Sequence, residues 1–429
     1  MPEIAVIADD LTGAADTGVQ FCPYFGTTVL TSYGNLSPDS HIRSSQALAI
    51  YTNSRAIKAE AAQKRLRSVA QQLLVLHPKR IYKKVDSCLR GNLGAEVDEI
   101  VDDMGFELSF IAPAFPEMGR LTLHDVHLLH DVPIAETELS QDPVSPITES
   151  RLSRIVSAQS RYGVGHVDVS FLEGDDEAMA GEIARLIEGG ARHVVFDVTS
   201  QAHLDRITRF ALNSDKKILL VGSAGLAGSL GTHFRRRDVE VEDEVKVSRE
   251  GGHLLVCGTA SDVMRVQISA LTKAYPYQVI PLMPSLLADQ DHRDKLLSQA
   301  PFARRLLSEN NVIMKIGPSE TGEANTLSAW GPEQIVEGLG LFVAKVLEGS
   351  RPASLFLSGG DTASAVLAAI GATGIRLLRE IVPGVAEGRI IGGPMDGLPV
   401  VTKAGAFGKE DTLIKVHEYW SKKGKGKSA

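Results

Sequence analysis

The chain has 429 residues, of which 43% are hydrophobic and 23% charged, enough for two soluble domains with a core each. Its net charge of −8 argues against non-specific nucleic-acid binding, because no excess of cations could neutralise a phosphate backbone. No apolar run or leader pattern predicts a membrane span or a secretion signal, and the three cysteines lack C-x-x-C spacing, so we expect a cytoplasmic protein.

Short apolar or β-branched runs alternate with amphipathic stretches through the first half of the chain. Two of these stretches, 56–76 and 176–190, have apolar residues that recur at spacings of three and four, which is typical of helices. The alternation predicts a mostly parallel sheet with helices on both faces. The predicted strands are 4–8, 27–31, 47–52, 80–85, 108–113, 193–198 and 217–222.

The pattern breaks at 235–252, a charge-dense stretch that we interpret as a linker, with or without an edge strand. We therefore predict an α/β protein of two domains, each a mostly parallel sheet flanked by helices: residues 1–235, a linker 236–252, and residues 253–429. The basic end, KKGKGKSA, is predicted to be a solvated tail. The predicted strands of the second domain are 253–259, 277–283, 311–317, 354–360, 389–393 and 399–405.

Two adjacent carboxylates, Asp9 and Asp10, follow the first predicted strand. Ligands of open α/β sheets bind beyond the carboxyl ends of the strands, and Thr12 and Gly13 open a helix whose N–H groups can meet an anion. Neighbouring carboxylates repel each other, which a fold tolerates more easily if they bind a cation or hydroxyl donors. The alternative is that one aspartate caps the helix and the other is solvated.

A second polar cluster, KKVDSCLRGN (83–92), follows the fourth predicted strand. It mixes cations, a carboxylate and a hydroxyl, as a small ligand with a carboxylate and hydroxyl groups requires. Arg55, after the third strand, could clamp a carboxylate, and the loop 111–120 is predicted to lie over the same edge. The alternative is a set of surface ion pairs. The residues singled out in this cluster are Lys84, Asp86, Ser87 and Arg90.

Three glycine-rich turns follow strands in the second half: CGTASD (257–262), LFLSGGDTASAVL (355–367) and TKAGAFG (402–408). Glycines let a backbone approach a phosphate, and helix N-termini and backbone nests supply N–H donors. Three such turns in one domain point to a nucleotide site of a build other than the Walker type. The residues singled out are Ser261, Gly359, Gly360, Thr362 and Lys403.

For two other strings we favour a structural role over a cofactor or metal site. GSAGLAG (222–228) departs from the G-x-G-x-x-G of dinucleotide sites, which favours tight helix packing over a nicotinamide site. His124, His127 and His130 would fan across about 120° of a helix and have no cysteine beside them, which favours partly buried or surface histidines over a zinc site.

Five separated strings, ADDLTGAADTG, KKVDSCLRGN, PAFPEMGR, SGGDTASAV and KAGAFG, occur in this order across nearly the whole chain. Together they resemble the four-carbon acid sugar kinase family, and most closely its threonate kinase branch. The resemblance implies an N-terminal domain for a four-carbon sugar acid and a C-terminal domain for ATP. It also implies transfer of the γ-phosphoryl group to the 4-hydroxyl of D-threonate, erythronate or 3-oxo-tetronate.

The resemblance also implies the residues of both sites. Arg90 joins the first set on its residue type, and Ser358 and Lys403 join the second on their places in the turns. The sugar-acid set is Asp9, Asp10, Arg55, Lys84, Val85, Asp86, Ser87 and Arg90. The ATP set is Ser261, Ser358, Gly359, Gly360, Asp361, Thr362, Lys403, Gly405, Ala406, Phe407 and Gly408.

On this basis we expect Asp10 or Asp86 to orient the acceptor hydroxyl or take its proton, with the choice left open. Lys84, Arg55 and Arg90 would hold the acid's carboxylate. The active site is expected in a cleft between the two domains, whose closure would exclude water.

Magnesium is expected to bridge the phosphates of ATP, with Asp361 or the pair of Asp9 and Asp10 as its protein contacts. Two other functions stay open: a nicotinamide-dependent sugar-acid oxidoreductase, and a non-catalytic sensor of sugar acid and nucleotide. The partners expected are a small sugar acid and ATP, with neither nucleic acid nor membrane, and a homodimer is left open.

Overall fold

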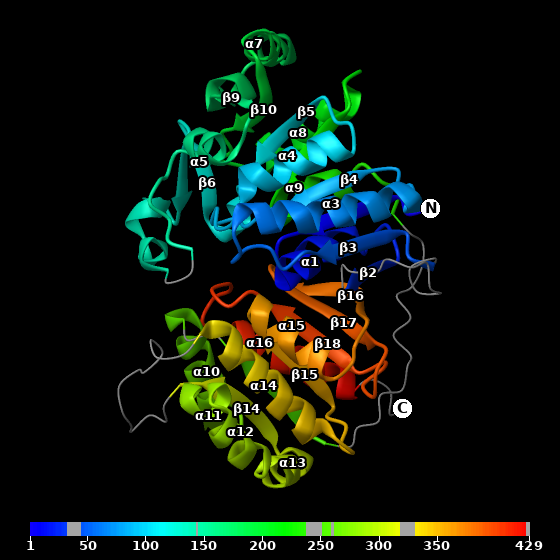
Figure 1. Cartoon of the computed structure of the whole chain (residues 1–429), viewed down its shortest axis with the longest axis vertical. Coiled ribbons are helices and arrows are strands. Elements are labelled where there is room, and N and C mark those ends of the chain that lie inside the picture. The colour runs from blue at the N-terminus through cyan, green and yellow to red at the C-terminus, as the bar shows by residue number, and fades with distance from the viewer. Residues whose placement is uncertain (32–43, 143–144, 237–250, 259–260, 318–330, 426–429) are drawn as a thin grey trace. The chain divides into compact units, whose positions relative to one another are not determined.

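A computed structural model describes residues 1–31, 44–142, 145–236, 251–258, 261–317 and 331–425 (Figure 1). The chain divides into two compact units, Met1–Arg237 and Asp238–Ala429. Most of the predicted linker and the last four residues of the predicted tail lie outside the described residues. Among the residues that are described, no helix combines the length and apolar character needed to cross a membrane.

The first unit is built on a parallel sheet. Its strands follow the order β2-β3-β1-β4-β11-β5-β10-β9, and each neighbouring pair runs parallel. Each run predicted as a strand in this half is confirmed, whereas the prediction missed β9, whose sequence GVGHV has only a weak β pattern. The strands are β1 (Ile4–Ala8), β2 (Thr27–Leu30), β3 (Ala47–Tyr51), β4 (Ile81–Lys84), β5 (Leu108–Ala112), β9 (Gly163–Val167), β10 (Ala191–Phe196) and β11 (Ile218–Gly222).

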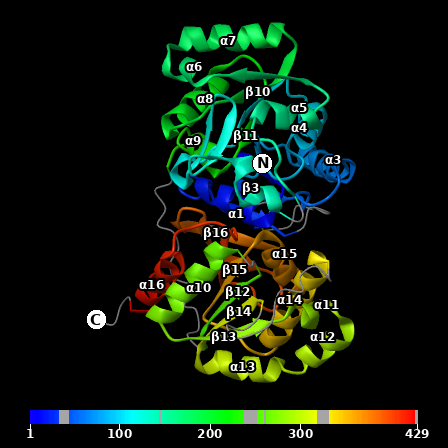
Figure 2. The same ribbon diagram turned by 90° about the vertical axis from the view of Figure 1, so that its left-hand side faces the viewer.

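Helices cover both faces of this sheet, as predicted. Figure 2 shows α8 and α9 on one side and α3, α4 and α5 on the other. The predicted helices 56–76 and 176–190 are confirmed as α3 and α7. The α-helices are α1 (Leu11–Gly18), α3 (Ala59–Leu76), α4 (Leu93–Asp103), α5 (Leu152–Gln159), α6 (Val169–Glu173), α7 (Asp176–Glu188), α8 (Gln201–Asn213) and α9 (Ala224–Gly231), and the 3-10 helices are η1 (Val19–Phe21), η2 (Pro116–Met118), η3 (Ile134–Glu136) and η4 (Glu138–Gln141).

A small antiparallel sheet follows β5. It consists of β6 (Arg120–Leu123), β7 (Val126–Leu129) and β8 (Val132–Pro133). The helical geometry considered for the three histidines is therefore wrong, because His127 lies on β7 while His124 and His130 lie in tight turns. Each turn is a His-Asp pair with positive φ, 50° and 69° in the first and 50° and 65° in the second, which matches the mirror-image turns that close hairpins. Asparagine-glycine is the usual signal for such turns, so this hairpin was missed.

The second unit has a mixed sheet in the order β13-β14-β12-β15-β18-β17-β16. The pairs from β13 to β18 run parallel, and β18-β17-β16 run antiparallel. The prediction missed β16 and found only the end of β17. The strands are β12 (His253–Cys257), β13 (Tyr277–Leu282), β14 (Asn311–Ile316), β15 (Ser354–Ser358), β16 (Gly374–Val382), β17 (Val385–Ile391) and β18 (Pro399–Lys403).

Helices flank this second sheet too. Figure 2 shows α10 and α16 on one side and α11, α12 and α14 on the other. Trp420 of α16 and Leu271 of α10 pack with Phe356 of β15 in a buried core. The helices are α10 (Asp262–Ala274), α11 (Pro284–Ala288), α12 (Gln290–Leu297), α13 (Ala300–Glu309), α14 (Pro332–Leu347), α15 (Gly360–Ala369) and α16 (Thr412–Lys425).

Candidate functional site

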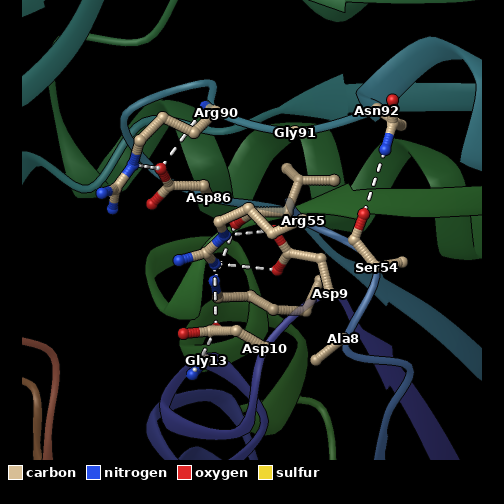
Figure 3. A network of polar contacts seen from close by, with 12 residues as sticks. Ala8, Asp9, Asp10, Gly13, Ser54, Arg55, Asp86, Arg90, Gly91 and Asn92 are labelled. Atoms are coloured by element: carbon tan, nitrogen blue, oxygen red, sulfur yellow. Dashed lines mark hydrogen bonds and ion pairs between the residues drawn. The ribbon is translucent and has the colours of Figure 1, made fainter. Parts of the chain in front are cut away.

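The carboxyl ends of three neighbouring strands carry the polar cluster of the first unit. β1 pairs in parallel with β3 on one side and with β4 on the other, so the segments that follow them begin at one edge of the sheet. The structure thus brings together the residues that the sequence proposed for an acid site (Figure 3). Asp9 and Asp10 follow β1, Arg55 follows β3, and Lys84, Val85, Asp86, Ser87 and Arg90 end or follow β4.

Arg55 relieves the repulsion between the adjacent aspartates. Its Nε and Nη2 donate to the two carboxylate oxygens of Asp9 at 2.6 and 2.9 Å, and Nη2 also donates to Asp10 Oδ1 at 2.9 Å (Figure 3). Burial raises the pKa of Asp9, but the charges of Arg55 and Lys84 outweigh that effect and hold the pKa below its usual value. One guanidinium therefore holds both carboxylates.

Asp10 also caps helix α1. Its Oδ1 accepts from the N–H of Gly13 at 2.8 Å and its Oδ2 from Thr12 Oγ1 at 2.7 Å. The alternative of one capping and one solvated aspartate is half right, since Asp10 is a cap but Asp9 is 4% exposed.

The two adjacent lysines of β4 point to opposite faces of the sheet. Lys84 lies so close to α1 that a Cβ on Gly13 would be 2.9 Å from its Nζ, and it donates to Val85 O at 2.8 Å. Lys83 instead forms a buried ion pair with Glu96 of α4, with 2.6 Å between Nζ and Oε2. Ser54 Oγ donates to the other oxygen of Glu96 at 2.6 Å, so this pair supports the segments after β3 and β4 from beneath.

Asp86 and Arg90 form the second ion pair of the site, with 2.5 Å between Oδ2 and Nε. Burial raises the pKa of Asp86, but Arg90, Arg55 and Lys84 outweigh it and hold the pKa well below its usual value. Arg90 Nη1 lies 3.7 Å from Asp142 Oδ2. The second oxygen of Asp86, Oδ1, accepts no hydrogen bond from any residue that the structure describes, so it can accept one from a ligand.

His127 fixes the turn that follows Asp86. Its Nε2 donates to the carbonyl of Ser87 at 2.8 Å, and its Nδ1 accepts from Thr122 Oγ1 at 2.9 Å. Burial lowers the pKa of His127 to about 4, so the imidazole is neutral. The hydroxyl of Ser87 is buried and has no partner among the described residues. This histidine is thus a buried support of the acid site, which the sequence pattern alone did not show.

A further polar group of this unit surrounds Asp197. Ligand atoms of His124, Asp168 and Asp197 lie within 4.8 Å of one another, a spacing that a metal ion could use. However, Asp197 already accepts the N–H groups of His124 and Val169 at Oδ2 and those of Asp125 and His166 at Oδ1. These hydrogen bonds explain the group without a metal ion: Asp197 holds the hairpin turn at His124 and Asp125 in place.

The loop 111–120 and the string 222–228 lie side by side. Ser223 Oγ donates to Ala114 O at 2.8 Å and caps α9. A Cβ on Gly222 would lie 2.5 Å from Ala112 O, and one on Gly225 would lie 3.1 Å from Ala114 O. These glycines serve close backbone packing, as predicted.

The three glycine-rich turns of the second unit follow three adjacent parallel strands, β12, β15 and β18. Ser261 caps α10, Ser358 ends β15, and the Gly359–Thr362 turn opens α15. The hydroxyl of Ser358 is buried and has no hydrogen-bond partner among the described residues. The sequence reading overlooked Gly258, where a Cβ would lie 1.8 Å from Thr362 Oγ1. Thr259 and Ala260 lie outside the described residues.

Lys403 is turned toward its own backbone. Its side chain is fully buried, and Nζ donates to the carbonyls of Ala404, Gly405 and Phe407 at 2.9, 3.1 and 2.8 Å. Burial lowers the pKa of Lys403 to about 7, because desolvation disfavours the charged form. The three donors of the ammonium are occupied, so the predicted direct contact of Lys403 with ATP gains no support from this geometry.

Two more side chains hold the same turn. Gln267 of α10 is buried and donates through Nε2 to Phe407 O at 3.1 Å and Lys409 O at 3.0 Å. Ser261 Oγ lies 3.3 Å from Gly405 O. Gln267 lies on an ordinary amphipathic helix and gave no sequence signal.

Gly359→Ala is expected to weaken nucleotide binding about ten- to hundredfold. Gly359 has φ 99° and ψ 137°, which a residue with a side chain adopts only at a cost of about 1–3 kcal/mol, so the turn would shift. Calorimetric titration with MgADP measures the effect. Gly349→Ala is the matched control, because Gly349 also has positive φ, 68°, and open space around its Cβ but lies outside the turns. Equal losses of affinity in the two variants would contradict the assignment.

Comparison with known proteins accounts for both halves of the chain. A family model described as a sugar-binding N-terminal domain matches residues 4–230, and one described as a nucleotide-binding C-terminal domain matches residues 254–413. A D-threonate kinase of Bordetella bronchiseptica is 32% identical over 96% of each chain. A D-erythronate kinase of Heliobacterium modesticaldum is 29% identical over 98% of this chain and 97% of its own.

The fold also has a solved counterpart. A crystal structure of a protein from Salmonella typhimurium matches with a TM-score of 0.78 at 22% identity, over 97% of this chain and 99% of its own. The two family models and the full-length relatives agree with the order of the five strings in the sequence. The chain therefore belongs to the four-carbon acid sugar kinase family, in which a sugar-binding N-terminal domain precedes a nucleotide-binding C-terminal domain.

Proposed function

We propose that this protein transfers the γ-phosphoryl group of ATP to the 4-hydroxyl of a four-carbon sugar acid. D-threonate is the first candidate, and D-erythronate and 3-oxo-tetronate are the others. The observation that carries the proposal is the cluster of cations and carboxylates beyond β3, β1 and β4, in the part of the chain matched by the sugar-binding model. The names of the relatives, a D-threonate kinase and a D-erythronate kinase, support the substrate class.

The cations of the cluster suit a small carboxylate ligand. Arg55 uses Nε and Nη2 for the two aspartates, and Nη1 donates to no described residue, which leaves it for an anion. Lys84 and Arg90 add charge from the neighbouring segment. A pocket of about 520 Å³ opens beside Arg55 and Gly91. We propose that these cations hold the acid's carboxylate and so determine which hydroxyl faces the nucleotide.

Asp86 is the better candidate for the acceptor hydroxyl. Asp10 already accepts three hydrogen bonds, from Gly13, Thr12 and Arg55. Asp86 has one oxygen fixed by Arg90 and one without a partner among the described residues. Its low pKa makes it a weak proton acceptor but a permanent hydrogen-bond acceptor, which suits phosphoryl transfer because the loose transition state depends mainly on positioning.

The nucleotide would be bound by the turns after β12, β15 and β18, with its phosphates at the N-terminus of α15. Magnesium fits Asp361, an exposed carboxylate in the first turn of that helix, because Mg²⁺ prefers oxygen ligands. Asp9 and Asp10 fit less well, because both are bound to Arg55. Bound magnesium would neutralise charge on the phosphates. The expected cleft between the two domains stays a prediction.

The test is ADP release from MgATP in the presence of each tetronate, separately. We expect release that depends on the acid, with one acid giving the highest kcat/KM and a product phosphorylated at the 4-hydroxyl. No acid-dependent release with any tetronate would reject the kinase and favour a sensor.

A separate experiment tests the oxidoreductase alternative. A ligand at about a hundred times its dissociation constant raises the free energy of unfolding by roughly 2.7 kcal/mol, so binding is visible as a rise in melting temperature. We expect a rise with MgATP and none with NAD. A rise with NAD alone would reject the nucleotide assignment.

A further inference from the structure

The buried ammonium of Lys403 lies in a ring of backbone oxygens. Its acceptors are the carbonyls of Ala404, Gly405 and Phe407, all in the turn that follows β18, at 2.8–3.1 Å. Among the described residues no carboxylate pairs with this ammonium, and the titratable group that acts on it electrostatically is Cys257, a thiol whose pKa burial raises to about 12. Within the described part of the chain, the charge of Lys403 is thus solvated by main-chain dipoles.

Carbonyl oxygens in such a cluster are what proteins use to replace the hydration shell of a potassium ion. An ammonium group and a potassium ion carry the same charge and are similar in size. We propose that Lys403 is a built-in monovalent cation: its ammonium occupies a carbonyl site of the potassium type and so holds the turn 404–408 in the form that binds the nucleotide's phosphates.

The peptide geometry links the ammonium to the opposite face of the turn. In a trans peptide the C=O and the N–H of the next residue point in opposite directions. Carbonyls of 404, 405 and 407 that point to Nζ therefore turn the N–H groups of Gly405, Ala406 and Gly408 away from it. These three N–H groups donate to no described residue, so they are available to an anion.

Neighbouring side chains keep the turn in place but do not replace the cation. Gln267 shares the carbonyl of Phe407 with Lys403, and Ser261 lies beside that of Gly405. Both groups are neutral. A variant without the ammonium would leave each of the three carbonyls with one neutral donor: Phe407 N–H for Ala404, Ser261 Oγ for Gly405 and Gln267 Nε2 for Phe407. Loss of the charged donor that all three share favours turning them outward and losing the N–H groups on the opposite face.

The experiment measures MgADP affinity by calorimetry and the melting temperature, at equal ionic strength in tetramethylammonium, sodium, potassium or ammonium chloride. The variants are Lys403→Ala, which leaves room for an ion, and Lys403→Met, which fills the space without charge and is expected to fold. Lys409→Ala is the matched control, because Lys409 is an exposed lysine close to the same turn.

We expect the parent and Lys409→Ala to bind MgADP equally in every salt. Lys403→Ala should bind roughly tenfold or more weakly in tetramethylammonium and regain affinity and melting temperature in potassium or ammonium, more than in sodium. Lys403→Met should bind weakly in every salt.

Three results would overturn the proposal: parental affinity in Lys403→Met, a potassium requirement in the parent, or no rescue of Lys403→Ala in potassium or ammonium, including failure to fold in every salt. The proposal goes beyond the proposed function, because MgADP binding needs no sugar acid. Failure of the kinase assay and failure of the rescue are therefore separate results.

Discussion

Replacing Asp86 by Asn is expected to lower kcat by about 10²- to 10⁴-fold while MgADP affinity stays that of the parent. The carboxylate has one oxygen held by Arg90 at 2.5 Å and a second that accepts nothing from the described residues. An amide of the same shape would present either a weaker acceptor or an N–H to the substrate's hydroxyl, and neither keeps the hydroxyl directed at phosphorus. Steady-state ADP release and calorimetry with MgADP measure the two quantities.

Two variants test whether the effect belongs to Asp86 itself. Asp142→Asn removes the other acidic group near Arg90, at 3.7 Å, and should keep the kcat of the parent. Asp10→Asn keeps a side chain that can cap α1 and should be affected less than Asp86→Asn. If Asp10→Asn loses turnover while Asp86→Asn keeps it, the hydroxyl-orienting role passes to Asp10.

Much of the arrangement of the two candidate sites was predictable, because the carboxyl ends of parallel strands lie at one edge of the sheet. Asp9, Asp10, Arg55 and Asp86 each follow an apolar run that forms a strand, so their positions in the sequence predict that they lie at one edge, and the same holds for the turns at 359 and 405. Position along a strand is thus enough to predict which residues become neighbours.

Partners and orientations were not predictable in the same way. Adjacent lysines on a strand must point to opposite faces of the sheet, but the sequence does not show which face carries the acid site. Glu96, the partner of Lys83, lies in an amphipathic helix pattern that gives it no distinguishing feature. Lys403 also ends a strand, where a contact with the ligand is expected, yet its flexible side chain turns back to the carbonyls of Ala404 and Phe407. The contact of His127 depends on a hairpin whose His-Asp turns lack the usual signal.

Glu96→Ala is expected to lower the free energy of unfolding of the first unit by about 3–5 kcal/mol. Lys83 is 0% and Glu96 1% exposed, and 2.6 Å separates Nζ from Oε2. Removing the carboxylate leaves a buried ammonium without its ion-pair partner and also removes the acceptor of Ser54 Oγ. For a domain of this size the change corresponds to a fall of about 10 °C in the melting temperature, measured by calorimetry.

Two further variants separate the effect of the isolated charge in Glu96→Ala from a simple loss of packing. The double variant Lys83→Met with Glu96→Leu removes both charges and fills a similar volume, so it should recover most of the stability that either single change loses, because isolated charge rather than the missing pair is what destabilises. Arg67→Met removes an exposed cation that pairs with Glu99 of α4; because Arg161 Nη1 stays 3.5 Å from Glu99, this variant should melt close to the parent. A double variant as unstable as Glu96→Ala would instead mean that the shape of the network, from Ser54 to Lys83, is what supports the strand ends.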